Sequence, residues 1–590
     1  MLVSEETAKS PDVGKTWRAR AGQLDLCSGL MTAAAVICSG FILALLAIIV
    51  WLSWFEGLPG DSSLVYTLRN YQRVFFEPFT FSVLFNTAVF SLISLGIAFI
   101  FGIPAAWLAE RTNLPGKTLL FTVMTASLLI PGFAVAMGWL LLLHPKIGVL
   151  NQWATNLFGS LYSPLSITTV VGMGCVQGLS LAPLAFIMTA AVFRAMDPSL
   201  EEAAQASGAS LFQTIRTVTL PLVWPGLLAA GIYILTIGIA AFDVPVIIGW
   251  SNRIFTFSTY IYLQVSPQEG LPRYGVAAAL SAFVLVLAGL LSWWYARVQC
   301  QSLHYEVITG KGYRPRIYRL GRAVVPAWIF IGAYILLSTV MPLGLLLWAS
   351  LLRFFEPPTL AAMSRASFLN FMTLPWDLVF RGTQNTLLLM AFTPTLTVPL
   401  SLAFSWVVLR SHMPGRFVLD FFVFLPHTLP SVVFGVGALL LALFVLQAVV
   451  PIYGTLWVLL FIYVIVRLSY GTRMMNSALI QIHRELEEAG YASGAGTWGV
   501  VRRILVPILT PTMLYSWLWI ALLTYRELTL AIFLSTPNNI TLPVVVWSLW
   551  ISGGLGQASA LTIIMLTLLA PIIAAYWFFA RRAGIISQET

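Results

Sequence analysis

The chain has 590 residues, of which 59% are hydrophobic and only 9% are charged. A soluble domain with so few charged side chains would aggregate, so the composition excludes an ordinary globular protein and predicts an all-α, polytopic membrane protein. The net charge of +10 also raises nucleic-acid binding as an alternative, which depends on where the basic residues lie.

Apolar runs long enough to cross a bilayer, which takes about 20 residues, recur along the whole chain. In order, they predict twelve spans near residues 30–54, 82–108, 119–143, 168–193, 225–247, 275–297, 325–350, 384–409, 419–447, 455–477, 511–534 and 558–580. The first run lacks a small-residue cleavage site and is predicted to be a retained span. The predicted domains are a tail (1–29), a first membrane half (30–297), a linker (298–324), a second membrane half (325–582) and a short tail (583–590).

The basic residues are distributed unequally between the two sides of these spans. With the N terminus inside, 22 of the 32 basic residues fall on the inner side and eight on the outer side, while Arg467 and Arg526 fall within spans. This asymmetry follows the positive-inside rule and predicts that both termini are cytoplasmic, which makes a nucleic-acid patch unnecessary. The four cysteines and five histidines show no ligand spacing, so neither a disulfide framework nor a metal site is predicted.

The chain contains an internal repeat. At an offset of 299, Asn86 pairs with Asn385, Gly116 with Gly415, Pro131 with Pro430 and Gly138 with Gly437; at an offset of 286, Glu202 pairs with Glu488, Gly208 with Gly494, Pro221 with Pro507 and Pro225 with Pro511. The difference of 13 residues predicts a longer external loop around residues 146–166 of the first half. Because each half has an even number of crossings, the halves are parallel and related by an axis along the membrane normal.

One polar segment recurs between the fourth and fifth spans of each half. It reads EAAQASGASLFQTIRTVTLP from Glu202 to Pro221 and EAGYASGAGTWGVVRRILVP from Glu488 to Pro507. Alanine and glutamate favour helix, a glycine permits a sharp turn, and the proline is expected to end the second helix before the next span. The pair Asp197-Pro198 suits a helix start just ahead of Glu202. Two short helices that project into the cytoplasm are predicted in each half; the alternative is an ordinary amphipathic connector.

Both segments resemble the EAA loop of permease subunits of ATP-binding-cassette importers with the type I fold. In that family the loop docks on the nucleotide-binding subunit and transmits its closure to the transmembrane helices. The resemblance implies coupling residues at Glu202, Ala203, Ala204, Gly208 and Pro221, and at Glu488, Ala489, Gly490, Gly494 and Pro507. The second copy departs from the pattern at Gly490, where the family has alanine, and at Val506, where leucine is usual; a slightly weaker helix is expected there.

The chain lacks a nucleotide-binding loop of its own. Gly14-Lys15-Thr16 and Gly116-Lys117-Thr118 match the end of a P-loop, but Lys9 and Arg111 stand where its first glycine is required. The chain is therefore expected to bind no cofactor and to be no enzyme. The resemblance implies that ATP and Mg are bound by two copies of a separate ATPase, and that one fused chain replaces a permease dimer in the bacterial inner membrane. An external binding protein would dock on the loops near 56–80, 248–273, 354–383 and 535–556.

Among the charged residues within or near the ends of predicted spans, five are candidates for a pathway or gate: Asp243, Arg467, Arg473, Arg526 and Glu527. A charge at the bilayer centre costs about 2.5–3.5 kcal/mol, so these residues either line a pathway or gate, or they pair or reach the interface. Six residues separate Arg467 from Arg473, about 240° around a helix, so these two are not expected to face one pore.

The cargo is suggested only by likeness. The segments FDVPVIIG from Phe242, RELTLAIFLSTP from Arg526 and IPGFAVAMGWLLLLHPKIGVLNQW from Ile130 resemble fused permeases of ferric-iron importers. That subfamily also resembles permeases for thiamine, phosphonates, sugar phosphates and polyamines, and intramembrane arginines suit an anionic or chelated cargo better than a bare cation.

Two other classes of protein are alternatives. A proton-coupled secondary transporter of the major facilitator type would also have twelve spans but would lack paired EAA loops. An intramembrane enzyme would need a nucleophile with a base, a carboxylate pair or a metal cluster, and none is recognisable in the sequence.

Overall fold

The computed structural model describes residues 26–56, 65–159, 164–196, 199–267, 270–302 and 317–582. Within these ranges the chain is almost entirely helical, and the strands are β1 (Phe55–Glu56) and β2 (Val65–Tyr66), which pair antiparallel. Eleven described helices are long and apolar enough to cross a membrane, and one bent pair raises the count to twelve, as predicted. Most of the predicted N-terminal tail, the middle of the linker and the last eight residues lie outside the described residues.

The first half contains α2 (Leu26–Leu52), α3 (Arg69–Phe76), α4 (Pro78–Arg111), α5 (Lys117–Ser127), α6 (Gly132–Leu143), α7 (Val149–Phe158), α8 (Val170–Ala195), α9 (Ser199–Ala206), α10 (Leu211–Thr214), the π-helical turn η2 (Ile215–Thr219), α11 (Leu220–Ala240), η3 (Pro245–Gly249), η4 (Trp250–Asn252), α12 (Phe257–Val265) and α13 (Tyr274–Ser302). The extra length predicted at 146–166 carries α7, for which the second half has only the short turn η8 (Leu446–Ala448).

The second half contains η6 (Gly321–Ala323), α14 (Val324–Ile335), η7 (Leu336–Val340), α15 (Met341–Ser350), α16 (Leu360–Met363), α17 (Leu369–Met372), α18 (Trp376–Arg410), α19 (Arg416–Thr428), α20 (Ser431–Phe444), η8, α21 (Leu456–Ile480), α22 (Arg484–Ala492), α23 (Thr497–Val500), η9 (Val501–Leu505), α24 (Val506–Tyr525), α25 (Thr529–Leu534), α26 (Leu542–Ile551) and α27 (Leu555–Arg582). The order of elements therefore repeats that of the first half.

Four spans predicted as continuous helices are broken. The span 119–143 is the pair α5 and α6, which meet at an angle of 92°, and 419–447 is the pair α19 and α20. Both breaks fall just before the repeated prolines Pro131 and Pro430, which cannot donate a helical hydrogen bond. The spans 225–247 and 511–534 also break, after Ala240 and after Tyr525, next to their charged residues.

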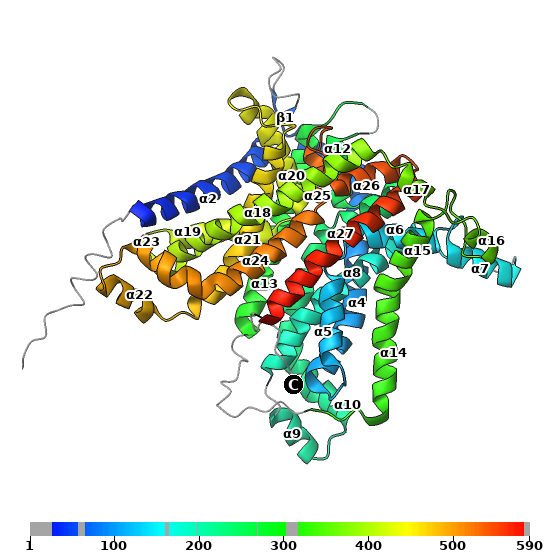
Figure 1. Ribbon diagram of the computed structural model, residues 1–590, viewed down its shortest axis with the longest axis horizontal. Coiled ribbons are helices and arrows are strands. Elements are labelled where there is room, and N and C mark those ends of the chain that lie inside the picture. Colours follow the sequence, from blue (N-terminus) through cyan, green and yellow to red (C-terminus); the bar gives the residue numbers. More distant parts are fainter. Residues whose placement is uncertain are drawn as a thin grey trace, which may run out of the picture.

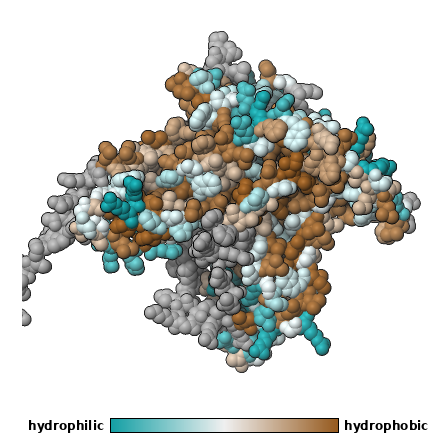
Figure 2. Space-filling view, viewed as in Figure 1, coloured by the Kyte–Doolittle hydropathy of each residue, from teal (hydrophilic) through white to brown (hydrophobic). Residues whose placement is uncertain are grey.

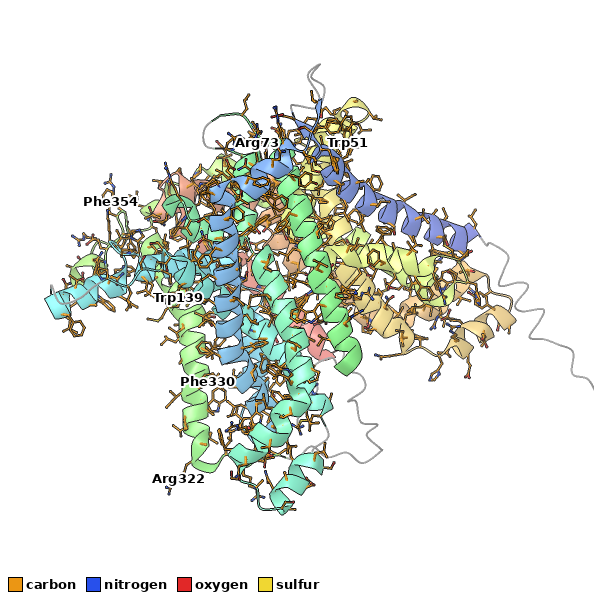
Figure 3. All side chains as sticks on the ribbon, turned by 180° about the vertical axis from the view of Figure 1, so that it is seen from behind. Trp51, Arg73, Trp139, Arg322, Phe330 and Phe354 are labelled. Atoms are coloured by element: carbon orange, nitrogen blue, oxygen red, sulfur yellow. The ribbon has the colours of Figure 1, made fainter. Side chains whose placement is uncertain are left out.

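The first helix of each half packs against the other half. Helix α2 packs on α18, α19 and α20, while α15 packs on α6 and η7 packs on α8. The repeated glycines lie at these contacts, because a Cβ on Gly437 would come within 2.7 Å of the carbonyl oxygen of Leu45, and a Cβ on Gly138 would overlap the backbone of Pro342. Farther along the same contact, the rings of Phe330 on α14 and Phe101 on α4 stack with centroids 5.5 Å apart (Figure 3).

The two repeated polar segments, which we call the first motif loop (199–221) and the second motif loop (484–507), occupy equivalent places in the two halves. Six crossings separate them along the chain, formed by α11, α13, α14–α15, α18, α19–α20 and α21. In Figure 1 the second loop lies at the left end of the structure and the first at the bottom, with α12, α26 and α17 toward the opposite, upper right side. Figure 2 shows apolar side chains across the middle of this view and polar ones gathered at its ends.

Candidate functional site

The first motif loop is a helix, a glycine turn and a second helix that continues into a span. Helix α9 ends at Ala206, and Gly208 follows with φ of +87°, a left-handed conformation that costs a glycine nothing. Glu202, Ala203 and Gly208 are exposed and Ala204 is half-buried, so the segment presents its motif residues to the surroundings. The predicted helix start at Asp197-Pro198 lies outside the described residues.

The second motif loop repeats this geometry. Helix α22 ends at Ala492, and Gly494 has φ of +85°. Glu488 and Ala489 are exposed, and Gly490 is buried. The predicted helices and their turn glycines are thus present in both halves. The ATPase-coupling role of these residues stays a prediction.

The expected effect of Pro221 and Pro507 was wrong. Neither proline ends the second short helix, because the helix runs on through α10, η2 and α11 in one half and through α23, η9 and α24 in the other. In both halves a π-helical turn ends two residues before the proline. The wider π turn shifts the hydrogen-bond register, so the missing proline N–H leaves the helix intact.

Gly490 has a packing role that the sequence pattern did not indicate. A Cβ at this position would lie 2.6 Å from Cδ1 of Ile504 and 3.1 Å from Cγ2 of Val500. The glycine therefore lets α22 lie close against α23 and η9. The departure from alanine is explained by close helix contact, in addition to the weaker helix propensity expected.

Two buried glutamates were missed by the sequence prediction. Glu201 is 0% exposed and Glu487 is 5% exposed, and each directly precedes the exposed glutamate of its motif. The repeat contained the signal, because Glu201 and Glu487 are 286 residues apart and the arginines that end α4 and α18, Arg111 and Arg410, are 299 apart.

In the second half this arginine and glutamate form an ion pair. Nε of Arg410 donates to Oε1 of Glu487 at 2.7 Å, and both side chains are nearly buried. The same guanidinium donates to the carbonyl oxygens of Leu479 at 3.0 Å and Ile482 at 2.8 Å. Burial raises the pKa of Glu487, and Arg410 opposes that rise. The pair ties α22 to the ends of α18 and α21.

In the first half the corresponding pair is absent. Arg111 donates to the carbonyl oxygen of Met196 at 3.0 Å, which repeats the contact of Arg410 with Ile482. Its Nε, however, is buried without a hydrogen-bond partner, and so is Oε2 of Glu201. Oε1 of Glu201 instead accepts from Oγ1 of Thr219 at 2.6 Å. The second half has Leu505 at the position equivalent to Thr219 and so has no competing hydroxyl.

The predicted intramembrane charges fall into two groups. Asp243, Arg467, Arg526 and Glu527 lie together at the breaks of the fifth and eleventh spans. Glu527 pairs with Arg467, and Arg526 donates to the carbonyl oxygens of Leu128 and Ile130 in the break between α5 and α6. Oγ1 of Thr529 donates to Oδ1 of Asp243 at 3.3 Å. Asp243 and Thr529 are equivalent in the repeat, so their contact marks the axis that relates the two halves.

Arg473 lies apart from this group. Its Nη2 is 3.4 Å from Oδ2 of Asp420 on α19, and its guanidinium lies 4.3 Å from the ring centroid of Phe424. Arg467 and Arg473 therefore point to different partners, as their spacing on the helix suggests. Within the described residues, no group of three or more His, Cys, Asp or Glu side chains is placed to hold a metal.

Comparison with known proteins places the chain in context. The model of the family described as binding-protein-dependent transport system inner membrane component matches residues 98–299 and again residues 396–585. The two matches follow the internal repeat, each takes in one motif loop, and together they cover more than half of the chain.

Several curated relatives are similar over most of the chain. The putative ferric transport system permease protein FbpB 1 of Haemophilus influenzae is 23% identical over 73% of this chain and 66% of its own length, which is slightly less than two thirds. The probable ABC transporter permease protein y4fN of Sinorhizobium fredii is 26% identical over 81% of this chain and 83% of its own. The putative 2-aminoethylphosphonate transport system permease protein PhnV of Salmonella paratyphi A is 27% identical over only 27% of this chain.

Proposed function

Because the chain belongs to the family of binding-protein-dependent transport system inner membrane components, we propose that it is a permease of an ATP-driven importer with two fused halves, and that ferric iron is its cargo. Its many apolar helices make it a multi-pass protein of the inner membrane. ATP and Mg are held by two copies of a separate ATPase, and an external binding protein delivers the cargo. Both termini and both motif loops face the cytoplasm.

One observation carries the proposal: two matching helical loops stand at equivalent places in the two halves, an even number of crossings apart, and each exposes the glutamate and alanine of its motif. A surface that is repeated in this way suits two identical partners. Glu202 and Glu488 are the first contacts with the ATPase, Ala203 and Ala489 are small enough to enter a groove, and Gly208 and Gly494 set the angle of each loop. A secondary transporter has no use for such a pair.

Ferric iron as the cargo is supported by the names of the relatives and by the share of this chain that they match. Three relatives named as ferric permeases are similar over 73% to 83% of this chain, whereas the phosphonate permease is similar over 27%. The intramembrane arginines no longer favour an anionic cargo, because Arg467 is paired with Glu527 and Arg526 is bound to two carbonyl oxygens. Their charge is balanced within the protein.

The charged group around Asp243 forms the gate of the pathway. Asp243 and Thr529 touch on the axis between the halves, where a central route must run, and Arg526 of the second half holds the broken span of the first half. Cargo passes when these contacts between the halves separate. We expect Asp243→Asn to alter the transport rate without changing ATPase binding.

The test of the importer is reconstitution of the chain with its ATPase and binding protein in proteoliposomes. We expect uptake of radioactive ferric iron that requires ATP, and we expect the double variant Glu202→Gln, Glu488→Gln to abolish uptake and weaken ATPase association while membrane insertion stays normal. Uptake driven by a proton gradient without any ATPase would overturn the importer. Uptake of 2-aminoethylphosphonate in place of iron would overturn the cargo alone.

A further inference from the structure

The environment of Glu201 differs from that of its repeat partner at two positions. Three of the four positions around the buried carboxylate are alike in both halves: an arginine that ends a long helix, a backbone carbonyl oxygen that this arginine binds, and the glutamate itself. The fourth position differs, with Thr219 in the first half and Leu505 in the second. In addition, Arg484, whose charge acts on Glu487, stands where the first half has Pro198.

Thr219 accounts for the missing ion pair. Its hydroxyl donates to Oε1 of Glu201 at 2.6 Å, and it lies on η2, the π turn that leads into the next span. Glu201 is 0% exposed and Arg111 is 1% exposed, so water does not replace the missing partner of either group. Nε of Arg111 and Oε2 of Glu201 remain without hydrogen bonds, although a buried donor and a buried acceptor each lose free energy in that state.

We propose that Glu201 exchanges partners, leaving Thr219 for Arg111 when α9 is displaced, whereas Glu487 stays fixed on Arg410. The first motif loop then has two stable positions and the second has one. Arg111 and Thr219 are positioning residues, because they act through Glu201 and touch no partner. The unsatisfied Arg111 Nε supplies the binding free energy of the displaced position, since donor and acceptor would both be ionised there, whereas the Thr219 hydroxyl is a neutral donor.

This exchange gives the two loops unequal stiffness. A force applied equally to both would move α9 first, because a hydroxyl–carboxylate bond yields before a guanidinium–carboxylate pair that is also tied to two carbonyl oxygens. In the importer proposed above, on which this consequence rests, two identical ATPase subunits would therefore act on two loops of unequal stiffness.

The test is hydrogen exchange on the full chain in lipid nanodiscs, without any partner. Thr219→Val keeps the shape of the side chain and removes the hydroxyl, so Glu201 turns to Arg111 and exchange across residues 199–206 slows by about tenfold. The matched control Thr219→Ser keeps the hydroxyl and leaves exchange within about twofold of the wild type. Exchange in Thr219→Val that equals the serine variant, or exceeds it, overturns the proposal.

A second variant separates the exchange from a general change in folding. Arg111→Gln in the Thr219→Val background should restore the faster exchange, while Arg111→Gln alone should change it by less than about threefold, because Arg111 is not bound to Glu201 at rest. Retention of slow exchange in the double variant would contradict the pairing with Arg111.

The consequence for transport is measured in a separate experiment. With the ATPase and binding protein present, Thr219→Val should change the amount of iron moved per ATP hydrolysed by about twofold or more, and Thr219→Ser should not. If the wild type moves no iron, the proposed function fails and the exchange result stands. An unchanged ratio together with slowed exchange would show that the partner exchange does not serve transport.

Discussion

The two motif loops share a backbone and differ in how they are anchored. Each has a short helix, a glycine at positive φ and a π turn before a proline, and each buries the glutamate that precedes its motif. In the second loop that glutamate meets an arginine, whereas in the first a threonine hydroxyl takes its place. The exchange of Leu505 for Thr219, together with that of Arg484 for Pro198, therefore gives two loops of the same shape different anchoring contacts.

Removing the arginine of each half should give the largest contrast. Arg410→Gln leaves the carboxylate of Glu487 buried without its cation, at a cost of about 3–5 kcal/mol. Arg111→Gln removes only the bond to the carbonyl oxygen of Met196 and should change exchange across α9 by less than about threefold, or about 0.7 kcal/mol. Hydrogen exchange of α22 and α9 measures the two losses. Equal losses would mean that the loops are anchored alike.

The turn glycines should instead give equal effects. Gly208 and Gly494 have φ of +87° and +85°, and a Cβ at either position would meet nothing within 4 Å. Alanine therefore adds only backbone strain, about 1–2 kcal/mol in each half. Thermal unfolding of Gly208→Ala and Gly494→Ala checks this value. A much larger cost in one half would reveal a difference in the turns themselves.

Neutralising Glu487 should cost less than removing Arg410. Burial raises the pKa of Glu487 above 4.5, so this carboxyl stabilises the folded loop below pH 4.5, and that contribution is lost as pH rises through the raised pKa. Acid should therefore not loosen α22. Glu487→Gln, which mimics the protonated form and can still accept a hydrogen bond from Arg410, should change the stability of the folded loop by less than about 1 kcal/mol at pH 7. Faster exchange of α22 on mild acidification of the wild type would contradict this assignment.

The smallest effects concern the position at which the motifs differ. Gly490→Ala gains helix propensity and pushes on the flexible end of Ile504, so the two terms should cancel to within about 0.5 kcal/mol. Its counterpart Ala204→Gly should cost about 1 kcal/mol, because α9 has no such contact to relieve. Thermal unfolding of the two variants compares the effect of helix propensity with the effect of the contact with Ile504. A gain in stability from Gly490→Ala would show that Ile504 moves freely.

Much of this architecture follows from sequence patterns. Apolar runs predict the spans because the bilayer requires them, and the offsets 299 and 286 predict the repeat and the placement of α7. The turns at Gly208 and Gly494 follow because few residues other than glycine adopt positive φ. These features depend on local chemistry and spacing.

What was missed depends on tertiary contacts. Pro221 and Pro507 were expected to end helices, because the π turns that accommodate them have no sequence signature in a single chain. Glu201 was overlooked beside the exposed Glu202, since only packing determines which of two adjacent glutamates is buried. The breaks after Ala240 and Tyr525 likewise reflect contacts between the halves.

The exchange of first helices constrains how the chain can be made. Helix α6 lacks its partner α15 until about 200 further residues have been synthesised, which takes roughly 10–40 s at ordinary translation rates. Helix α2 waits longer, since its neighbours begin at Trp376. Neither half can finish folding while the other is still on the ribosome, so the nascent chain must spend that interval with unpaired helices in the lipid. Fusion into one polypeptide keeps each late partner at high local concentration when it arrives.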